Sequence, residues 1–206
     1  MEKYVLDTNL FFNMEPGLDL GEKSLEVIKT VTSGILKLKS KGKAAFLMPP
    51  SVVKELRSFF EEEPSTLKSF LAEIVVKSPN INQTTFPANV FYALVDEIKE
   101  RILKGKIASE DELYKAVSSL APVELKSKKE IQMKIGSFTK SLRERYRQAT
   151  RTGFLDSIAD LDLIVLAKEE DAYLVSTDEG VILWGRKFGV KEMDPIVFGK
   201  KLKGLD

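Results

Sequence analysis

The chain has 206 residues, a length that corresponds to one domain, or to one domain that carries a modest insertion. It contains no cysteine and no histidine, which excludes disulfides, thiolate nucleophiles, zinc-finger sites and Ser-His-Asp triads. An enzyme of this composition has to rely on carboxylates, hydroxyls, Lys, Arg or a metal ion held by oxygen. We expect a cytoplasmic protein, because cysteine is absent, the first residues do not resemble a signal peptide, and no apolar run approaches the about 20 residues that span a bilayer.

The first part of the chain alternates predicted strands and helices. A short apolar strand over 3–6 ends at Asp7, and a helix over 22–41 follows. A second strand over 44–48 is stopped by two prolines, after which Ser51 is predicted to cap a helix over 52–60. Another helix is predicted over 64–76. This alternation is typical of α/β folds with a central parallel sheet.

The middle of the chain has helical spacing only. It predicts a helix over 90–103, a second helix that begins with the capping-box pattern at Ser109, and a long basic helix after Pro122. The α/β pattern resumes with a helix over 156–170, a strand over 173–176, a helix over 181–187, an edge strand near 190–193 and a terminal helix. We therefore expect a core formed by residues 1–85 and 152–206, with an all-helical insertion over 86–151.

Charge is distributed unevenly along the chain, although its overall value is only +1. The segment from Lys126 to Arg151 holds nine basic and two acidic residues, a local net charge of +7, so the rest of the chain carries −6. Within it, Arg143, Arg147 and Arg151 repeat every four residues and form one stripe of a helix, with Arg145 offset from them. Guanidinium groups suit phosphate oxygens, so we predict RNA binding by all four of these arginines, and a solvated helix face with Glu144 pairing nearby is the alternative.

Two predicted strands end in an aspartate, Asp7 in the first and Asp178 in the strand near the end of the chain. The carboxyl ends of neighbouring parallel strands line one crevice, so these two acids are expected to face the same cleft. Asp156 and Asp160 are four residues apart and would share one face of a helix. Asp162 is a less certain member of the cluster, and Glu55, on the helix after the second strand, ranks below the four aspartates.

Several carboxylates in one cleft repel one another unless a cation holds them ionised. Because only oxygen ligands are present, Mg²⁺ or Mn²⁺ is the expected metal, and such a site suits activation of water for attack on a phosphodiester. Each acid taken singly has another interpretation. Asp7 and Asp156 would also serve as helix caps, Asp178 as a turn residue, and Asp160 and Glu55 as surface residues.

Taken together, these motifs resemble the PIN-domain nucleases. The resemblance rests on a strand followed by Asp7-Thr8-Asn9, on Ser51 to Glu55 in a middle helix, on the acidic helix at 156–162, and on Leu174-Val175-Ser176-Thr177-Asp178. The helical, arginine-rich insertion makes the chain similar to the small protein-only ribonucleases P first known from Aquifex, the HARP group. The resemblance covers nearly the whole chain and implies a three-layer α/β/α core with a central parallel sheet.

The resemblance also implies an activity and a set of site residues. It implies removal of the 5′ leader of precursor tRNA by metal-activated water, with Asp7, Asp156, Asp160 and Asp178 as catalytic and metal-binding acids. The basic stripe would then bind the double-stranded stems of tRNA through their backbone. The resemblance further implies a homo-oligomer, dodecameric in the family, in which Phe91, Tyr92, Leu94 and Val95 pack between subunits. The simpler expectation for these four residues is an intramolecular core.

Two other functions stay open on the sequence. The first is another PIN specificity, such as a toxin-like or rRNA-processing nuclease. The second is a non-catalytic RNA-binding partner of an RNA ligase, since archaeal relatives of the group are also labelled RNA ligase partner proteins. Basic charge alone would suit that partner, which would not call for four aspartates.

Overall fold

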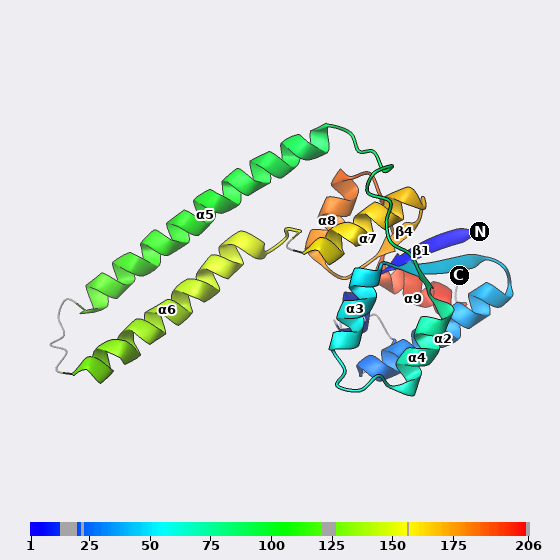
Figure 1. Ribbon diagram of the computed structural model, residues 1–206, viewed down its shortest axis with the longest axis horizontal. Helices are drawn as coiled ribbons and strands as arrows, with labels where there is room; N and C mark the ends of the chain where they lie inside the picture. Colours follow the sequence, from blue (N-terminus) through cyan, green and yellow to red (C-terminus); the bar gives the residue numbers. More distant parts are fainter. Residues whose placement is uncertain (13–19, 22, 121–126, 156, 205–206) are drawn as a thin grey trace. The chain divides into compact units, whose positions relative to one another are not determined.

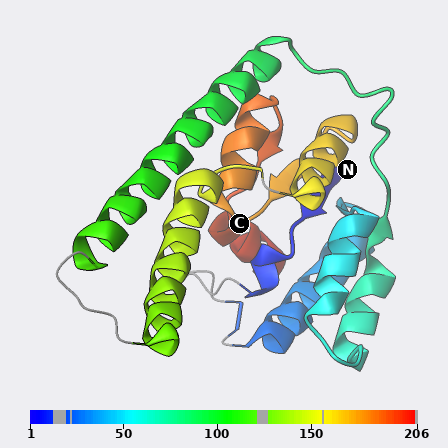
Figure 2. The same ribbon diagram turned by 60° about the vertical axis from the view of Figure 1, so that its left-hand side comes forward.

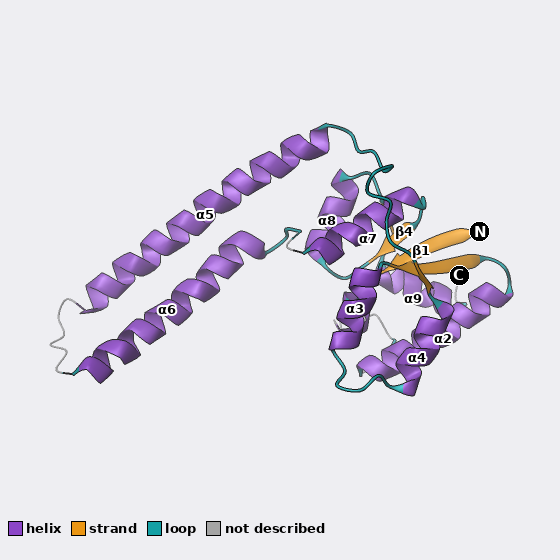
Figure 3. Cartoon of the chain, viewed as in Figure 1, coloured by secondary structure: helices purple, strands orange, loops and turns teal. Residues whose placement is uncertain are grey.

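The computed structural model describes residues 1–12, 20–21, 23–120, 127–155 and 157–204. The chain divides into two compact units, which we call the core unit (Met1–Pro87 with Leu155–Asp206) and the helical unit (Ala88–Phe154). All described strands belong to the core unit, as the orange ribbons in Figure 3 show. Within the described ranges, no helix combines the length and the apolar character needed to cross a membrane.

The core unit is built on a five-stranded sheet in which every pair of neighbouring strands is parallel. The strand order is β3-β2-β1-β4-β5. The strands are β1 (Glu2–Leu6), β2 (Ala44–Met48), β3 (Val75–Val76), β4 (Tyr173–Val175) and β5 (Lys191–Glu192). The predicted α/β fold with a central parallel sheet is confirmed. Because all strands point the same way, their carboxyl ends form one edge, which we call the acid edge.

Helices cover both faces of this sheet (Figures 1 and 2), as buried parallel strands require. Helices α2 (Ser24–Ser40), α4 (Ser65–Glu73) and α9 (Pro195–Lys203) pack together as one group, and α7 (Ile158–Glu169) packs with α3 (Pro50–Ser58) and α8 (Glu179–Lys187) as another. A single turn of helix, α1 (Asn9–Phe12), follows β1. Within the core, the ring of Tyr4 stacks on Phe46 at 5.3 Å between centroids and contacts Phe198 of α9 at 5.4 Å.

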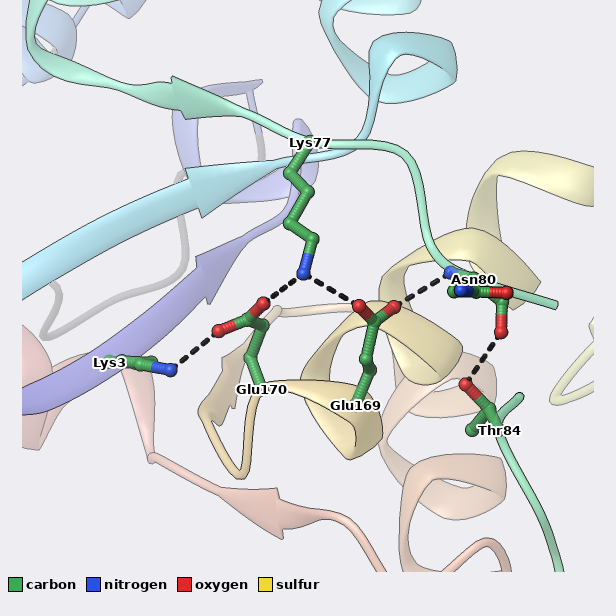
Figure 4. A network of polar contacts seen from close by, with 6 residues as sticks. All are labelled: Lys3, Lys77, Asn80, Thr84, Glu169 and Glu170. Carbon is green, nitrogen blue, oxygen red and sulfur yellow. Dashed lines mark hydrogen bonds and ion pairs between the residues drawn. The ribbon is translucent and has the colours of Figure 1, made fainter. Parts of the chain in front are cut away.

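The direction of α7 is fixed by polar contacts at its carboxyl end. Figure 4 shows Glu170, just after α7, paired with Lys3 of β1 at 2.5 Å and with Lys77, which follows β3. Lys77 also pairs with Glu169 at 2.6 Å, and Glu169 accepts the backbone N–H of Asn80 at 2.7 Å. These contacts hold the end of α7 at the start of β1, so its first turn lies toward the acid edge.

Two expectations for the core unit are wrong. The helix predicted over 64–76 ends at Glu73, because Val75 and Val76 instead pair with β2 as strand β3. Ser51 does not cap the following helix, since α3 already begins at Pro50. A proline fits the first turn of a helix because its missing N–H has no partner there in any case, and the Ser51 hydroxyl is used elsewhere.

The described residues of the helical unit form two helices, α5 (Asn89–Leu120) and α6 (Lys128–Arg151), which run side by side in Figure 1. The predicted break before Ser109 is wrong: α5 is continuous, and the Ser109 hydroxyl donates to the carbonyl of Gly105 at 2.9 Å within the helix. A glycine suits position 105 of α5 because the Tyr146 ring of α6 packs directly on it, and an added Cβ there would lie 2.9 Å from that ring.

The expectation of an intramolecular core for the start of α5 is also wrong. Phe91, Tyr92 and Val95 are exposed, and Leu94 is only half-buried. Two packed helices have a single contact face, so apolar residues on their other faces remain in contact with solvent.

We predict opposite effects of Gly→Ala at two helical positions. An added Cβ at Gly34 of α2 would lie 2.6 Å from Cβ of Leu202 in α9, so Gly34→Ala forces these helices apart and should lower the free energy of unfolding by ~1–3 kcal/mol. Nothing lies within 4 Å of the corresponding position at Gly136 of α6, so Gly136→Ala should stabilise its helix by up to ~1 kcal/mol. Denaturant unfolding checks both, with fluorescence of the single tryptophan, Trp184, reporting on the core unit and circular dichroism on the helices. Equal effects of the two substitutions would contradict this account of α2–α9 packing.

Candidate active site

The Asp7 carboxylate lies at the centre of the acid edge, directly after β1. The residue is only 2% exposed. Its Oδ2 accepts a short hydrogen bond from the Ser176 hydroxyl, and its Oδ1 lies 3.3 Å from the Thr8 hydroxyl. The backbone and side-chain nitrogens of Asn9 approach the two carboxylate oxygens at 3.4 Å each. The side chain is therefore held in one orientation from several sides.

Ser176 links the ends of two neighbouring strands. While its hydroxyl donates to Asp7, its oxygen accepts the backbone N–H of Asp178 at 2.9 Å. Asp178 is in turn the N-cap of α8, and its Oδ1 accepts the N–H groups of Gly180 at 2.7 Å and Val181 at 3.1 Å. The structure thus brings Asp7 and Asp178 to one place, as parallel strands with acids at their ends predict.

Glu55 reaches the same place from α3. The Thr8 hydroxyl donates to its Oε2 at 3.2 Å, and the single hydrogen of this hydroxyl is shared between Glu55 and Asp7. Asp7 is close enough to both Asp178 and Glu55 for their charges to act on it.

The remaining acids belong to α7 or precede it. The Ser51 hydroxyl at the start of α3 donates to Oδ2 of Asp162 at 2.6 Å, which places the first turns of α7 at the carboxyl end of β2. Asp160, two residues earlier in the same helix, lies at this end of α7, where its N–H donates to the capping hydroxyl of Ser157 at 3.1 Å. Asp156 lies outside the described residues. Ser157 is the N-cap of α7.

The electrostatics of this edge favour a bound cation. Burial raises the pKa of the Asp7 carboxyl above its ordinary value, and the negative charges of Asp178 and Glu55 raise it further, while hydrogen bonds from Ser176 and Asn9 lower it in part. Within the described part of the chain, no Lys or Arg forms an ion pair with Asp7, Glu55, Asp162 or Asp178. A divalent ion would supply the missing positive charge, and an all-oxygen donor set fits Mg²⁺ or Mn²⁺.

A complete ligand set is not assembled by these residues alone. Across the described ranges, which leave out Asp156, no three acidic side chains come close enough together to hold a metal ion. Oxygen donors and negative charge at the acid edge suit a hard cation, but the described residues alone do not complete its ligand set; Asp7 and Asp178 are the acids that the structure links most directly.

The predicted arginines lie on α6 in the helical unit. Arg145 turns toward α5, where its Nη1 lies 2.7 Å from Oε1 of Glu112 and its Nη2 lies 3.4 Å from Oδ2 of Asp111. Arg147 pairs with Glu144 on the exposed face at 2.9 Å, as the alternative interpretation of this face anticipated. Arg143, Arg147 and Arg151 line a groove of about 430 Å³, and Arg145 does not.

Comparison with known proteins agrees with the fold. Residues 3–205 match the PINc domain ribonuclease family. A protein of Thermococcus kodakarensis named RNA-free ribonuclease P is 36% identical over 203 residues, which cover 98% of this chain and 95% of that protein. A protein of Pyrococcus horikoshii with the same name is 37% identical over 205 residues, which cover 100% of this chain and 93% of the relative.

The chain belongs to the PINc-domain ribonucleases, in the RNA-free ribonuclease P group. In this RNA-free ribonuclease P family member, the fold and the positions of Asp7 and Asp178 follow from strand order. Three hydroxyls at the acid edge belong to sequence motifs but were not predicted as site residues, namely those of Thr8, Ser51 and Ser176. A Ser or Thr within two residues of a strand-end aspartate is the signal that could have pointed to Thr8 and Ser176. The Ser51 contact has no such local signal, because it joins residues 111 positions apart.

We predict that acid weakens the helical unit of this family member through Glu112. Hydrogen bonds from Lys115, Arg145 and Ser141 lower the pKa of Glu112 from 4.5 to about 2. A lowered pKa in the folded state stabilises the fold fully above pH 4.5, and the contribution disappears as the pH falls from there toward 2. In Glu112→Gln this contribution is missing at every pH. Thermal unfolding followed by circular dichroism should therefore show a stability gap between wild type and Glu112→Gln at pH 7 that narrows at pH 3. A gap of constant size would rule out the charged pair as its cause.

Proposed function

We propose that this chain is a protein-only ribonuclease P that removes the 5′ leader of precursor tRNA by hydrolysis of one phosphodiester. The observation that carries the proposal is the buried Asp7 carboxylate, which faces Asp178 and Glu55 at the acid edge and has no basic ion-pair partner among the described residues. Full-length similarity to proteins named RNA-free ribonuclease P supports this activity over other PIN specificities. We propose the reducing cytoplasm as its setting.

We assign Mg²⁺ or Mn²⁺ to Asp7, Asp156, Asp160 and Asp178, with Asp162 and Glu55 as additional acids. Asp156 enters this set by its place in the sequence. When bound, the ion supplies activation of water and neutralisation of the scissile phosphate. The chain itself holds the acids in register: Ser176 orients Asp7 and the backbone of Asp178, and Ser51 orients Asp162. Hydrolysis would leave a 5′-phosphate on the tRNA and a 3′-hydroxyl on the leader.

We assign RNA binding to Arg143, Arg147 and Arg151 on the groove side of α6. The pair between Arg147 and Glu144 is exposed, so phosphate oxygens can replace the carboxylate at little cost. We leave Arg145 out of the RNA-binding set and assign it a structural role, because its guanidinium pairs with Glu112 and so joins α6 to α5.

Substitution at Asp178 separates its two roles. Asn is as good an N-cap as Asp, so Asp178→Asn should keep α8 capped and the fold stable while it removes a carboxylate. Asp178→Ala loses the cap as well and should lower the free energy of unfolding by ~1 kcal/mol.

Both variants should lose cleavage of 5′-labelled precursor tRNA in Mg²⁺. Wild type should cut this RNA once, at the mature 5′ end, and should not cut it in EDTA. Asp194→Asn, at the similar cap of α9, is the matched control and should retain cleavage. Scattered cuts would favour another PIN nuclease, and tight RNA binding without any cut would favour a ligase partner.

We also propose that the protein forms homo-oligomers through the start of α5. Phe91, Tyr92 and Val95 are exposed there in addition to Ile98 and Ile102, and exposed apolar residues that gather on one element are typical of protein–protein contact surfaces. Light scattering coupled to size exclusion should give a mass that is a multiple of 23.1 kDa, and Phe91→Glu with Val95→Glu should reduce it. A strict monomer in the wild type would reject the proposal.

A further inference from the structure

The groove of about 430 Å³ between α5 and α6 is lined by aromatic, basic and small polar side chains. Its lining consists of Ser109 from α5 and of Leu142, Arg143, Tyr146, Arg147, Thr150 and Arg151 from α6. No acidic residue belongs to this lining, although Glu144 of the same helix pairs with Arg147 at 2.9 Å, so the other two arginines carry most of its positive charge. The groove therefore attracts anions, and it also offers a flat aromatic surface.

Tyr146 is fixed in this groove by its contact with α5. One side of its ring packs against Gly105, where an added Cβ would come within 2.9 Å of ring atom Cε2. The residue is nevertheless 48% exposed. A ring that is held by the backbone on one side and open on the other needs no further ordering before a planar group stacks on it.

The arginines surround this ring at helical spacing. Arg143 and Arg147 lie three residues before and one residue after Tyr146, and Arg151 follows one turn later. Arg143 forms no ion pair with any other described residue. A purely double-stranded RNA presents phosphates to such a surface but keeps its bases stacked inside the helix, out of reach of the Tyr146 ring.

We infer that this groove binds an unpaired nucleotide of the RNA, with the base stacked on Tyr146 and the flanking phosphates held by Arg143, Arg147 and Arg151. The inference rests on the proposed RNA-processing function and narrows the ligand of the helical unit from a duplex backbone to a loop or bulge in a structured RNA. Stacking on an aromatic ring and pairing of Arg with phosphate are the two means by which proteins hold single-stranded nucleotides.

Binding is tested without cleavage, in EDTA, with the full-length protein. The probes are an RNA hairpin that carries 2-aminopurine in its loop and a blunt duplex with the same number of phosphates. Wild type should bind the hairpin at least about tenfold more tightly than the duplex and should change the 2-aminopurine fluorescence on binding. Tyr146→Phe should behave as wild type. Tyr146→Leu, which fills the space against Gly105 without an aromatic face, should lose the preference for the hairpin.

Salt dependence separates stacking from phosphate contact. Tyr146→Leu should leave the slope of log affinity against log salt unchanged, whereas Arg143→Ala should reduce its magnitude by about one for both probes. Tyr114→Leu, an exposed tyrosine of α5 outside the groove, is the matched control and should bind as wild type does. Thermal unfolding of each variant shows whether the hairpin of helices is intact.

Equal affinity of wild type for hairpin and duplex, or unchanged hairpin binding by a folded Tyr146→Leu variant, would overturn the inference. Failure of the proposed function would look different, since it would appear as absence of precursor tRNA cleavage while Tyr146-dependent hairpin binding in EDTA persists. With an active enzyme, Tyr146→Leu should raise KM for precursor tRNA and leave kcat close to the wild-type value.

Discussion

A buried carboxylate that faces two other carboxylates is the constraint to which the core unit is adapted. Removing an ionised Asp7 from water is unfavourable, and Asp178 and Glu55 add repulsion, so the native sheet carries this residue only because hydroxyl and amide donors surround it. These donors compensate the charge in part and also fix the direction of the oxygen atoms. A bound cation, if this edge takes one as we propose, would offset the remaining repulsion and stabilise the folded state.

The second requirement is that helix α7 points its first turn at the same edge. Two sets of contacts at its opposite ends achieve this. Glu169 and Glu170 are held by Lys77, which follows β3, and by Lys3 near the start of β1, whereas Asp162 is held by Ser51, which follows β2. An ion pair near the surface contributes little to stability by itself. Here such pairs matter because they set the direction in which α7 presents Asp160 and Asp162.

The strand pattern and the aspartates at strand ends predicted the fold and the meeting of Asp7 with Asp178, because parallel order alone brings successive strand ends to one edge. Three features could not be predicted in the same way, and each depends on a partner distant in sequence. Val75 and Val76 form a strand only because β2 offers an unpaired edge, and Gly105 continues α5 only because α6 packs on it. The local sequence predicts Ser51 as a helix cap, but its hydroxyl donates instead to Asp162, 111 residues later in the chain.

The helical unit shows the same dependence on distant partners in its use of arginine. Arg101 donates to the carbonyls of Thr150 and Thr152 at 3.0 and 2.9 Å and lies over the ring of Phe154, so it binds the carboxyl end of α6, where the helix dipole is negative. Arg145 joins the middle of the hairpin through Glu112.

With little apolar surface to bury, two helices are held in register by such polar contacts, and the arginines that make them are not available to a ligand. Spacing on α6 cannot distinguish these from Arg143, since all are equally basic in the sequence. The distinction depends on α5, where Glu112 and Asp111 pair with Arg145 and Gly105 leaves room for the Tyr146 ring. The face of α6 that lines the groove therefore remains basic and aromatic. The arginines that hold the two helices together are therefore different from those that line the groove, so removal of the Arg143 side chain should leave the helices folded.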